Sequence, residues 1–326
     1  MMLSIAAIVV GLVFLVWSAD RFIFGAAQTA VHFKVPPILI GLTIVSIGTS
    51  APEMLVALSA SLQNNPGLAI GNVYGSNIAN IALVLGVTAL VAPLAVHSAT
   101  LRRELPILLL INVVVIALIF DGTLGQLDGV LLLIGLVVVM GILIRLSRSA
   151  GANDPIKTDF DKELKKQGSI AKALVWLVVG LIVLVISAKL LVWGAVNIAQ
   201  AMGVSDLVIG LSIVAIGTSL PELAASVTGA LKGEYDLVIG AIVGSNIFNF
   251  LLVLAMPALF APGSFPAEVL YRDAPIALAL TVALFLMAMG LRKTGYIMRW
   301  EGAVLFAVFV AYMVFIYYQS LVVATA

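Results

Sequence analysis

The chain has 326 residues, of which 63% are apolar and only 10% are charged. Soluble domains are about half apolar and about a quarter charged, so this composition excludes a soluble globule and predicts a protein that sits in lipid. The net charge of +1 provides no cationic face for nucleic acid, and the absence of cysteine excludes disulfides, thiolate metal sites and thiol catalysis.

The apolar stretches predict an all-α membrane protein with ten transmembrane helices, each near the length of about 20 residues that a crossing requires. The first stretch has no basic residue before it and no small-residue cleavage site after it, so we interpret it as a retained span rather than a signal peptide. In chain order, the predicted spans are 3–27, 35–61, 68–92, 104–120, 126–146, 171–199, 205–231, 236–261, 273–291 and 299–319.

Basic residues predict the orientation of these spans, because Lys and Arg accumulate in short loops on the cytoplasmic side. Fourteen of the seventeen Lys and Arg residues fall between an odd-numbered span and the next one. Both termini are therefore predicted to lie outside the cytoplasm. The segment 147–170 is too short for a regulatory domain, and we interpret it as a solvated cytoplasmic linker.

The sequence repeats itself at a constant offset that brings Gly41 onto Gly210, with 19 identities among the 40 positions that align 41–80 with 210–249. Chance does not produce such a match, so the chain is predicted to consist of two five-helix repeats, 1–146 and 171–326. Because the offset crosses five spans, the second repeat is predicted to enter the membrane in the inverted orientation. Inverted repeats are typical of secondary transporters, whose sites lie near the bilayer midplane between the repeats.

Two glutamates, Glu53 and Glu222, are predicted in the middle of the second and seventh spans, each in a copy of the sequence G-T-S-x-P-E. A carboxylate in mid-bilayer is costly unless it is paired, hydrated or bound to a cation, which favours a functional role. The proline removes a backbone donor and the glycine loosens the same turn. Each motif therefore predicts a broken helix whose carbonyl groups, at 46–49 and 215–218, can bind a cation.

The other polar side chains of the repeated motifs offer only oxygen as a metal ligand. Pairs of these side chains that are four residues apart in the chain lie on the same face of a helix. This pattern predicts a site for a hard cation such as Ca²⁺ or Na⁺ rather than for zinc or copper. Two carboxylates neutralise one Ca²⁺ or two Na⁺, so the two ions would compete. The predicted side-chain ligands are Glu53, Glu222, Thr49, Thr218, Ser50, Ser219, Ser76, Ser245, Asn80 and Asn249.

Structural interpretations compete with these functional ones. Ser and Asn often link membrane helices by hydrogen bonds, and a buried carboxyl group can be protonated and bonded to a neighbour. The glycine pairs 71/75 and 240/244 favour close helix packing over ligand binding. Asp20 and Lys189 are repeat equivalents within spans one and six, and snorkelling or local pairing is favoured for both.

The doubled G-T-S-x-P-E motif, followed after about twenty residues by G-S-N-I-x-N, resembles the alpha repeats of the calcium/cation antiporter superfamily. Over nearly its full length the chain is similar to the bacterial YrbG-type calcium/sodium antiporters. The resemblance implies ten transmembrane helices in a bacterial inner membrane, and exchange of Na⁺ for Ca²⁺ at the ligands above. It also implicates the carbonyl groups of Ser46 and Ala215 as sodium ligands. No enzyme activity, cofactor or protein partner is expected.

Two positions depart from the family pattern: Asn249 stands where an aspartate is common, and Ser46 where a small apolar residue is usual. The stoichiometry and the coupling ion therefore stay open. Na⁺-driven Ca²⁺ antiport is the leading hypothesis. The alternative is Ca²⁺/H⁺ or other divalent cation antiport, because two carboxylates in a low-dielectric site should hold a proton when no cation is bound. An intramembrane hydrolase is disfavoured because no His lies in mid-span to act as a base.

Overall fold

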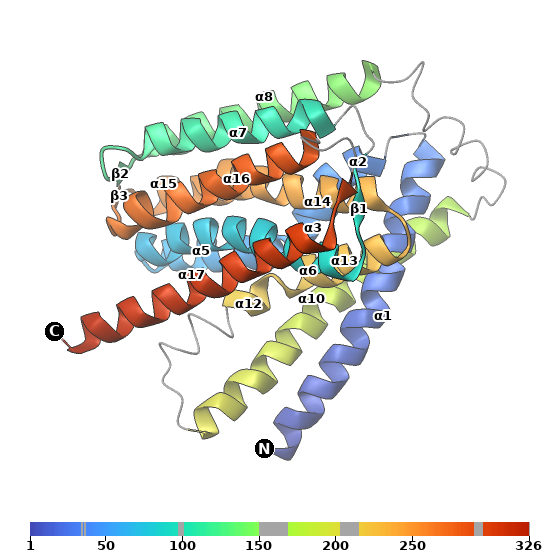
Figure 1. The fold of residues 1–326 in the computed structure, drawn as a ribbon, viewed down its shortest axis with the longest axis horizontal. Coiled ribbons are helices and arrows are strands. Elements are labelled where there is room, and N and C mark those ends of the chain that lie inside the picture. Colours follow the sequence, from blue (N-terminus) through green and yellow to red (C-terminus); the bar gives the residue numbers. More distant parts are fainter. Residues whose placement is uncertain are drawn as a thin grey trace.

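The computed structural model describes residues 1–33, 35, 37–96, 101–149, 169–202, 215–289 and 296–325. The described chain is almost entirely helical, which confirms the all-α prediction. Most of the long helices run along one common direction, and α1 and α10 lie side by side at an angle to them (Figure 1).

Short helical segments interrupt the longer helices in both halves of the chain, and η marks a π-helical segment. The helices of the first half are α1 (Met2–Phe33), α2 (Pro37–Ile40), η1 (Gly41–Val45), α3 (Ser46–Thr49), α4 (Ala51–Leu62), α5 (Pro66–Ala79), η2 (Asn80–Leu85), α6 (Gly86–Val91), α7 (Leu101–Leu118) and α8 (Gln126–Ser149). Those of the second half are α10 (Ile170–Ala201), α12 (Ala215–Thr218), α13 (Leu220–Leu231), α14 (Tyr235–Phe248), η5 (Asn249–Val253), α15 (Ala255–Phe260), η6 (Val269–Asp273), α16 (Ala274–Met289) and α17 (Arg299–Thr325).

The local structure of the two halves repeats at the same offset as the sequence. Helices α4 and α13, α5 and α14, and α6 and α15 each begin and end at equivalent positions of the repeat. The π-helical segments η2 and η5 also begin at equivalent positions, Asn80 and Asn249. Each copy of the repeat therefore folds into the same order of elements, which is a helix, a π-helical turn and a second helix.

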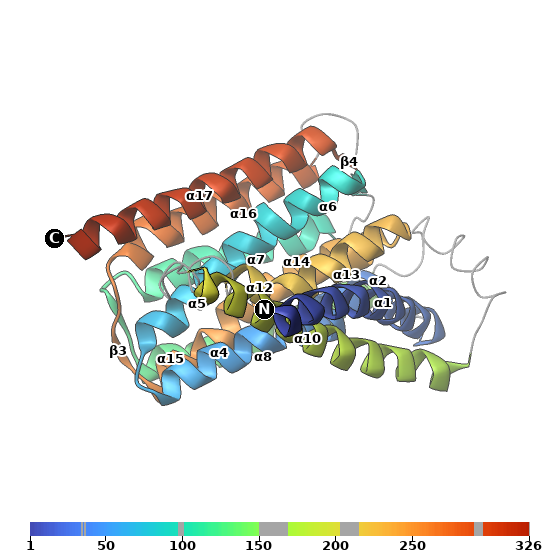
Figure 2. The same ribbon diagram turned by 90° about the horizontal axis from the view of Figure 1, so that it is seen from below.

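Four very short strands form two antiparallel pairs that link the halves. β1 (Leu94–Ala95) pairs with β4 (Tyr296–Ile297), and β2 (Thr123–Leu124) pairs with β3 (Gly263–Ser264). The repeat equivalents β1 and β3 lie at opposite ends of the molecule (Figures 1 and 2). We call these the β1/β4 end and the β2/β3 end.

Seven helices in the described residues are long and apolar enough to cross a membrane. The helix pair Gly41–Thr49 and Ala51–Leu62, bent by 54°, would make an eighth span, and Glu104–Leu118 is a shorter apolar helix. The first part of the predicted seventh span and most of the predicted linker 147–170 lie outside the described residues, and the count of ten stays a prediction.

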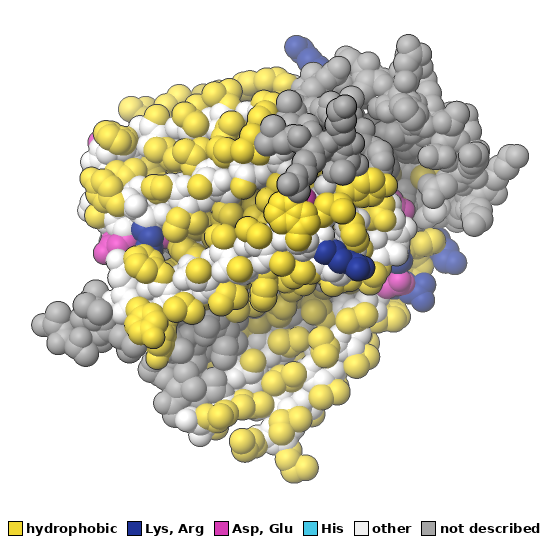
Figure 3. Space-filling view, viewed as in Figure 1, with side chains coloured by type: hydrophobic (Ala, Val, Ile, Leu, Met, Phe, Trp, Pro, Cys, Tyr) yellow, Lys and Arg dark blue, Asp and Glu magenta, His cyan; other side chains and the backbone are white. Residues whose placement is uncertain are grey.

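Burial divides the bundle into a core and a periphery. The spans Pro66–Val91 and Tyr235–Phe260 are 83% and 94% buried, whereas the other candidate spans are 22–39% buried. The visible surface is covered with apolar side chains along the helices, and charged side chains gather toward the two ends (Figure 3). Such a surface suits lipid. The two most buried spans, which carry the G-S-N-I motifs, form the centre of the bundle.

Glycine allows α1 and α10 to pack with their backbones in contact. A Cβ atom added at Gly25 would lie 2.4 Å from the Leu177 nitrogen, and one at Gly194 would lie 2.6 Å from the Ser4 oxygen. These two glycines are repeat equivalents, so each repeat contributes one glycine that permits close backbone contact. Small residues permit this close approach where lipid offers no hydrophobic driving force between helices.

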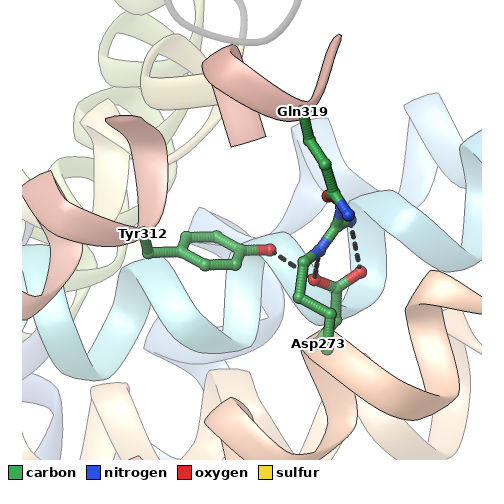
Figure 4. A network of polar contacts seen from close by, with 4 residues as sticks. Asp273, Tyr312 and Gln319 are labelled. Atoms are coloured by element: carbon green, nitrogen blue, oxygen red, sulfur yellow. Dashed lines mark hydrogen bonds and ion pairs between the residues drawn. The ribbon is translucent and has the colours of Figure 1, made fainter. Parts of the chain in front are cut away.

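A buried polar network fastens η6 to α17 near the β2/β3 end (Figure 4). Arg272 Nε and Nη2 donate to the two carboxylate oxygens of Asp273 at 2.7 and 3.0 Å. Tyr312 Oη donates to Asp273 Oδ1 at 2.9 Å, and Arg272 Nη1 donates to Gln319 Oε1 at 2.6 Å. The buried carboxylate is thus compensated by a paired charge and a hydroxyl, as its position requires.

Candidate functional site

Two helix breaks with the same backbone conformation position the predicted acidic residues. Ser50, between α3 and α4, has φ −79° and ψ 8°, and Ser219, between α12 and α13, has φ −88° and ψ 4°. In each case a proline follows at the second helical position and Glu53 or Glu222 follows in the first turn. The broken helix predicted for the first motif is confirmed by the 54° bend.

The structure buries both carboxylates and places each beside hydroxyl groups of the opposite repeat. Glu53 is 2% exposed and Glu222 is 4% exposed. Ser50 Oγ donates to Glu222 Oε1 at 3.0 Å, and Thr49 also contacts the Glu222 carboxylate. In the reciprocal arrangement, Thr218 contacts the Glu53 carboxylate. The two motifs therefore form a single centre, in which the carboxylates are close enough to interact electrostatically.

This centre contains buried oxygen atoms that have no hydrogen-bond partner among the described residues. They include Oε2 of Glu53, Oε2 of Glu222 and Oγ of Ser219. Unpaired buried carboxylate oxygens are expensive, and a cation bound between them would remove that cost. Among the described residues no group of three or more His, Cys, Asp or Glu side chains is arranged to hold a metal, so such a cation would depend on these two carboxylates and on neutral oxygens.

Helices α5 and α14 contribute the remaining predicted side chains. Ser76, Asn80, Ser245 and Asn249 are all buried, and within the described chain Ser245 Oγ and both amide atoms of Asn249 have no hydrogen-bond partner. Asn80 Nδ2 donates to Asn246 Oδ1 at 3.1 Å and so joins α5 to α14. Both Asn80 and Asn249 stand where the helix changes to a π-helical segment, a distortion that is frequent at functional sites.

The two predicted backbone ligands differ in how fully the structure describes them. The Ser46 carbonyl accepts the Ser50 N–H at 3.0 Å and the Thr49 hydroxyl at 3.5 Å, so its role as a cation ligand stays a prediction. The Ser46 hydroxyl donates to the Leu42 carbonyl at 2.8 Å and is engaged within its own helix. Ala215 is the first residue of α12, and its role as a carbonyl ligand stays a prediction.

Sequence reasoning missed two asparagines that support the site. Asn246 accepts from Asn80 as described above, and it is part of the repeated G-S-N-I motif, which was the available signal. Asn72 Nδ2 donates to the Glu53 carbonyl at 3.2 Å and ties α5 to α4. The repeat equivalent of Asn72 is Ala241, so no symmetry marked this residue.

A cavity of about 740 Å³ leads toward this centre between α4 and α10. Its lining includes Pro52 and Thr218 beside the two breaks, and Gln63 and Asn65 just beyond the end of α4. Because Thr218 contacts the Glu53 carboxylate, the cavity reaches the acidic centre. It could therefore carry a cation from one end of the molecule to the site.

Comparison with known proteins identifies the family of this chain. The family model described as sodium/calcium exchanger protein matches residues 3–145 and 172–318. The chain belongs to the sodium/calcium exchanger protein family. The matched segments correspond to the two repeats and leave out the residues between them. The resemblance to a YrbG-type calcium/cation antiporter is thereby confirmed, and the family is one of transporters.

Similar proteins extend over almost the whole chain. The putative antiporter CaxA of Alkalimonas amylolytica is 46% identical over 312 residues, with 96% of this chain and 98% of the relative covered. Inner membrane protein YrbG of Escherichia coli is 40% identical over 322 residues, with 98% of each covered. A structure of the sodium-calcium exchanger NCX_Mj is 32% identical, with a TM-score of 0.82 and coverage of 95% and 97%. The chain is therefore a multi-pass membrane protein with the fold of a cation antiporter.

Proposed function

We propose that this protein exchanges Ca²⁺ for Na⁺ across the membrane by alternating access at the centre formed by Glu53 and Glu222. The observation that carries the proposal is the pair of buried carboxylates from equivalent helix breaks, each with an oxygen that has no hydrogen-bond partner in the described part of the chain. With both carboxylates ionised, the empty centre holds two negative charges. Bound Ca²⁺ or two Na⁺ would neutralise them, and the empty centre would be costly to carry across the bilayer.

The ligands of this site are proposed to be those of the repeated motifs. The two glutamates supply charge, and the hydroxyl and amide oxygens of 49, 50, 76, 80, 218, 219, 245 and 249, with the carbonyl groups of 46 and 215, replace water. Support comes from the cross-repeat contacts of Ser50 and Thr218 with the two carboxylates. Asn249 is neutral, so the centre has no third carboxylate at that position.

The proposed architecture is ten transmembrane helices in two inverted repeats, 1–146 and 171–326. Its support is that the equivalent strands β1 and β3 lie at opposite ends of the molecule, as inversion requires (Figure 1). The proposed orientation places the β1/β4 end in the cytoplasm and both termini outside it. Its support is that basic residues accumulate in cytoplasmic loops, and Arg299, at the start of α17, donates to the Val91 carbonyl just before β1 at 3.4 Å.

Flux measurements test the coupling ion directly. Everted membrane vesicles containing the protein are loaded with Na⁺ or acidified in separate experiments, and Ca²⁺ movement is followed with an external indicator. We expect a Na⁺ gradient to drive Ca²⁺ movement with the proton gradient collapsed by an uncoupler. Ca²⁺ movement driven only by a proton gradient would reject Na⁺ coupling in favour of the Ca²⁺/H⁺ alternative, and no movement under either gradient would reject both.

A further inference from the structure

Two cavities occupy equivalent places in the two repeats, and they differ greatly in size. The cavity between α4 and α10 has a volume of about 740 Å³, whereas a second one beside Glu222 has a volume of about 10 Å³. Four lining positions of the second cavity are the repeat equivalents of lining positions of the first. These pairs are Ile23 and Val192, Thr49 and Thr218, Ala225 and Val56, and Leu237 and Leu68.

The small cavity is small because the helices around it are packed together. α1 packs along α13, whereas their repeat equivalents α10 and α4 are separated by the large cavity. The large cavity extends to residues beyond the end of α4, next to α5, where Gly67 approaches Pro266 close to β3. The open route therefore leads to the β2/β3 end, and the equivalent route to the β1/β4 end is closed.

An ion pair joins the helices that close this second route. Lys232 Nζ lies 2.8 Å from Asp20 Oδ1, and it also donates to the Asp20 carbonyl at 2.9 Å. Asp20 lies on α1, and Lys232 directly follows α13. Asp20 is therefore paired, but with a residue of the other repeat rather than with a local partner as predicted.

The equivalent positions at the other end cannot form such a pair. The repeat equivalent of Asp20 is Lys189 and that of Lys232 is Gln63, and both line the large open cavity. Gln63 Nε2 donates to Ser59 within its own segment. Within the described chain, Lys189 has no ion-pair partner. The closed route thus has a charge pair between the segments that flank it, and the open route has no such pair among the described residues.

We propose that Asp20 and Lys232 act as a latch that closes the access route at the β1/β4 end and favours the conformation open at the opposite end. The latch rests on the proposed function, because alternating access requires the two routes to exchange their open and closed states. Opening the β1/β4 route would separate Asp20 from Lys232, whose repeat equivalents Lys189 and Gln63 line the open cavity. Arg21 Nε lies 3.9 Å from Asp20 Oδ2 and would remain on α1 beside the released carboxylate.

The size of the expected effect follows from the exposure of the pair. The side chains of Lys232 and Asp20 are 31% and 47% exposed, so water screens their attraction. Pairs of this kind shift an equilibrium by about fivefold or less. A bias of that size favours one state while leaving the other accessible, which suits a transporter that must visit both.

The absence of cysteine allows a direct measurement of which route is open. Val56→Cys and Ala225→Cys introduce a single thiol at equivalent positions, one in the open cavity and one in the closed cavity. A membrane-impermeant maleimide is applied to right-side-out vesicles for the first reporter and to everted vesicles for the second. In the otherwise unchanged protein, we expect rapid labelling of Val56→Cys and slow labelling of Ala225→Cys.

Breaking the latch should open the second route. Asp20→Asn or Lys232→Gln should raise the labelling rate of Ala225→Cys by about fivefold. The double exchange Asp20→Lys with Lys232→Asp should restore slow labelling, which a purely local packing effect would not do. Lys189→Gln, the equivalent of a latch residue but without an ion-pair partner in the described chain, is the matched control and should leave this rate unchanged.

Building the pair at the opposite end gives an independent test. Gln63→Lys with Lys189→Asp places the latch chemistry across the open cavity, and labelling of Val56→Cys should fall by about fivefold. Unchanged labelling in both Asp20→Asn and Lys232→Gln, in protein that elutes as a single species, would overturn the latch. Labelling does not depend on which ions are exchanged, so altered labelling without Ca²⁺ flux would instead reject the proposed function.

Discussion

The two G-T-S-x-P-E helix breaks have nearly the same sequence and backbone, yet their surroundings differ. Toward the β2/β3 end a cavity of about 740 Å³ reaches Thr218, whereas the equivalent space beside Thr49 has about 10 Å³. The same contrast appears at two equivalent glycines. A Cβ atom added at Gly244 would lie 2.5 Å from the Leu42 oxygen, but one added at Gly75 would meet no atom of the described residues within 4 Å. Equivalent sequences thus support an open and a closed arrangement within one molecule.

The largest effect should come from removing the negative charge of either glutamate of the site. Glu53→Gln or Glu222→Gln keeps the size of the side chain but removes a charge that a bound cation would pair with. Losing one partner of a buried charge pair costs about 3–5 kcal/mol, so apparent Ca²⁺ affinity should fall about 100-fold or more. Ca²⁺ flux in vesicles and the Ca²⁺-dependent rise in Tm of the purified protein measure this loss.

Glu268→Gln is the control for these variants, because Glu268 is exposed near the β2/β3 end and should leave both readouts unchanged. If the centre is shared by the repeats, both site variants should be impaired to a similar degree. Retained flux in both, in folded protein, would remove the basis for the site. Full activity in one variant and none in the other would show that the repeats do not contribute equally.

Much of the site could be predicted from the sequence because the repeat constrains both halves at once. The positions of Glu53 and Glu222, their burial and the helix break beside Ser50 all follow from the doubled motif. The partner of Asp20 could not be predicted, because Lys232 is distant in the chain and its repeat equivalent Gln63 is uncharged. The described residues contain seven candidate spans and one bent helix pair, because short and bent helices do not each form a full crossing.

The motifs do not predict the difference between the two cavities. Nearly the same motif sequence lies beside the open cavity and beside the closed one, so the motif does not determine which arrangement is adopted. The packing interpretation of the glycine pairs illustrates this. It holds for Gly244, which approaches the backbone of η1, and it does not hold for Gly71 and Gly75, which have open space around them in the described chain. Equivalent residues therefore have different neighbours in this state.

An intermediate effect is expected from filling these glycine positions. Gly244→Ala would force the Cβ atom against the backbone of η1, and overpacking of this kind costs about 1–3 kcal/mol. The Tm of the purified protein should fall accordingly. Gly75→Ala is the matched variant and should leave Tm nearly unchanged, since there is space for the methyl group in the described structure.

The same two glycine variants also test whether the two halves exchange their packing during transport. If the halves exchange arrangements during transport, Gly75 should approach its neighbours closely in the other state, and Gly75→Ala should slow Ca²⁺ flux without lowering Tm. A Gly75→Ala variant with normal Tm and normal flux would indicate that the two halves do not exchange their packing at this position. Equal loss of Tm in both variants would contradict the asymmetry itself.

The smallest effect concerns the polar network between η6 and α17, which has no counterpart at the equivalent described positions of the first half. Tyr312 donates to Asp273, but the equivalent positions are occupied by Leu143 and by Glu104, whose carboxylate oxygens have no hydrogen-bond partner among the side chains that the structure describes. Tyr312→Phe removes one hydrogen bond and leaves Asp273 paired with Arg272, so the loss of stability should be about 1 kcal/mol.

A small fall in Tm with unchanged Ca²⁺ flux is the expected result for Tyr312→Phe, and Tyr318→Phe on the exposed face of α17 should change neither. This outcome would assign the network to holding the periphery of the bundle rather than to the ion site. A loss of flux at unchanged Tm would show instead that the contact of Tyr312 with Asp273 acts in transport. The asymmetry between the halves would then extend from the access routes to the charges that line the bundle.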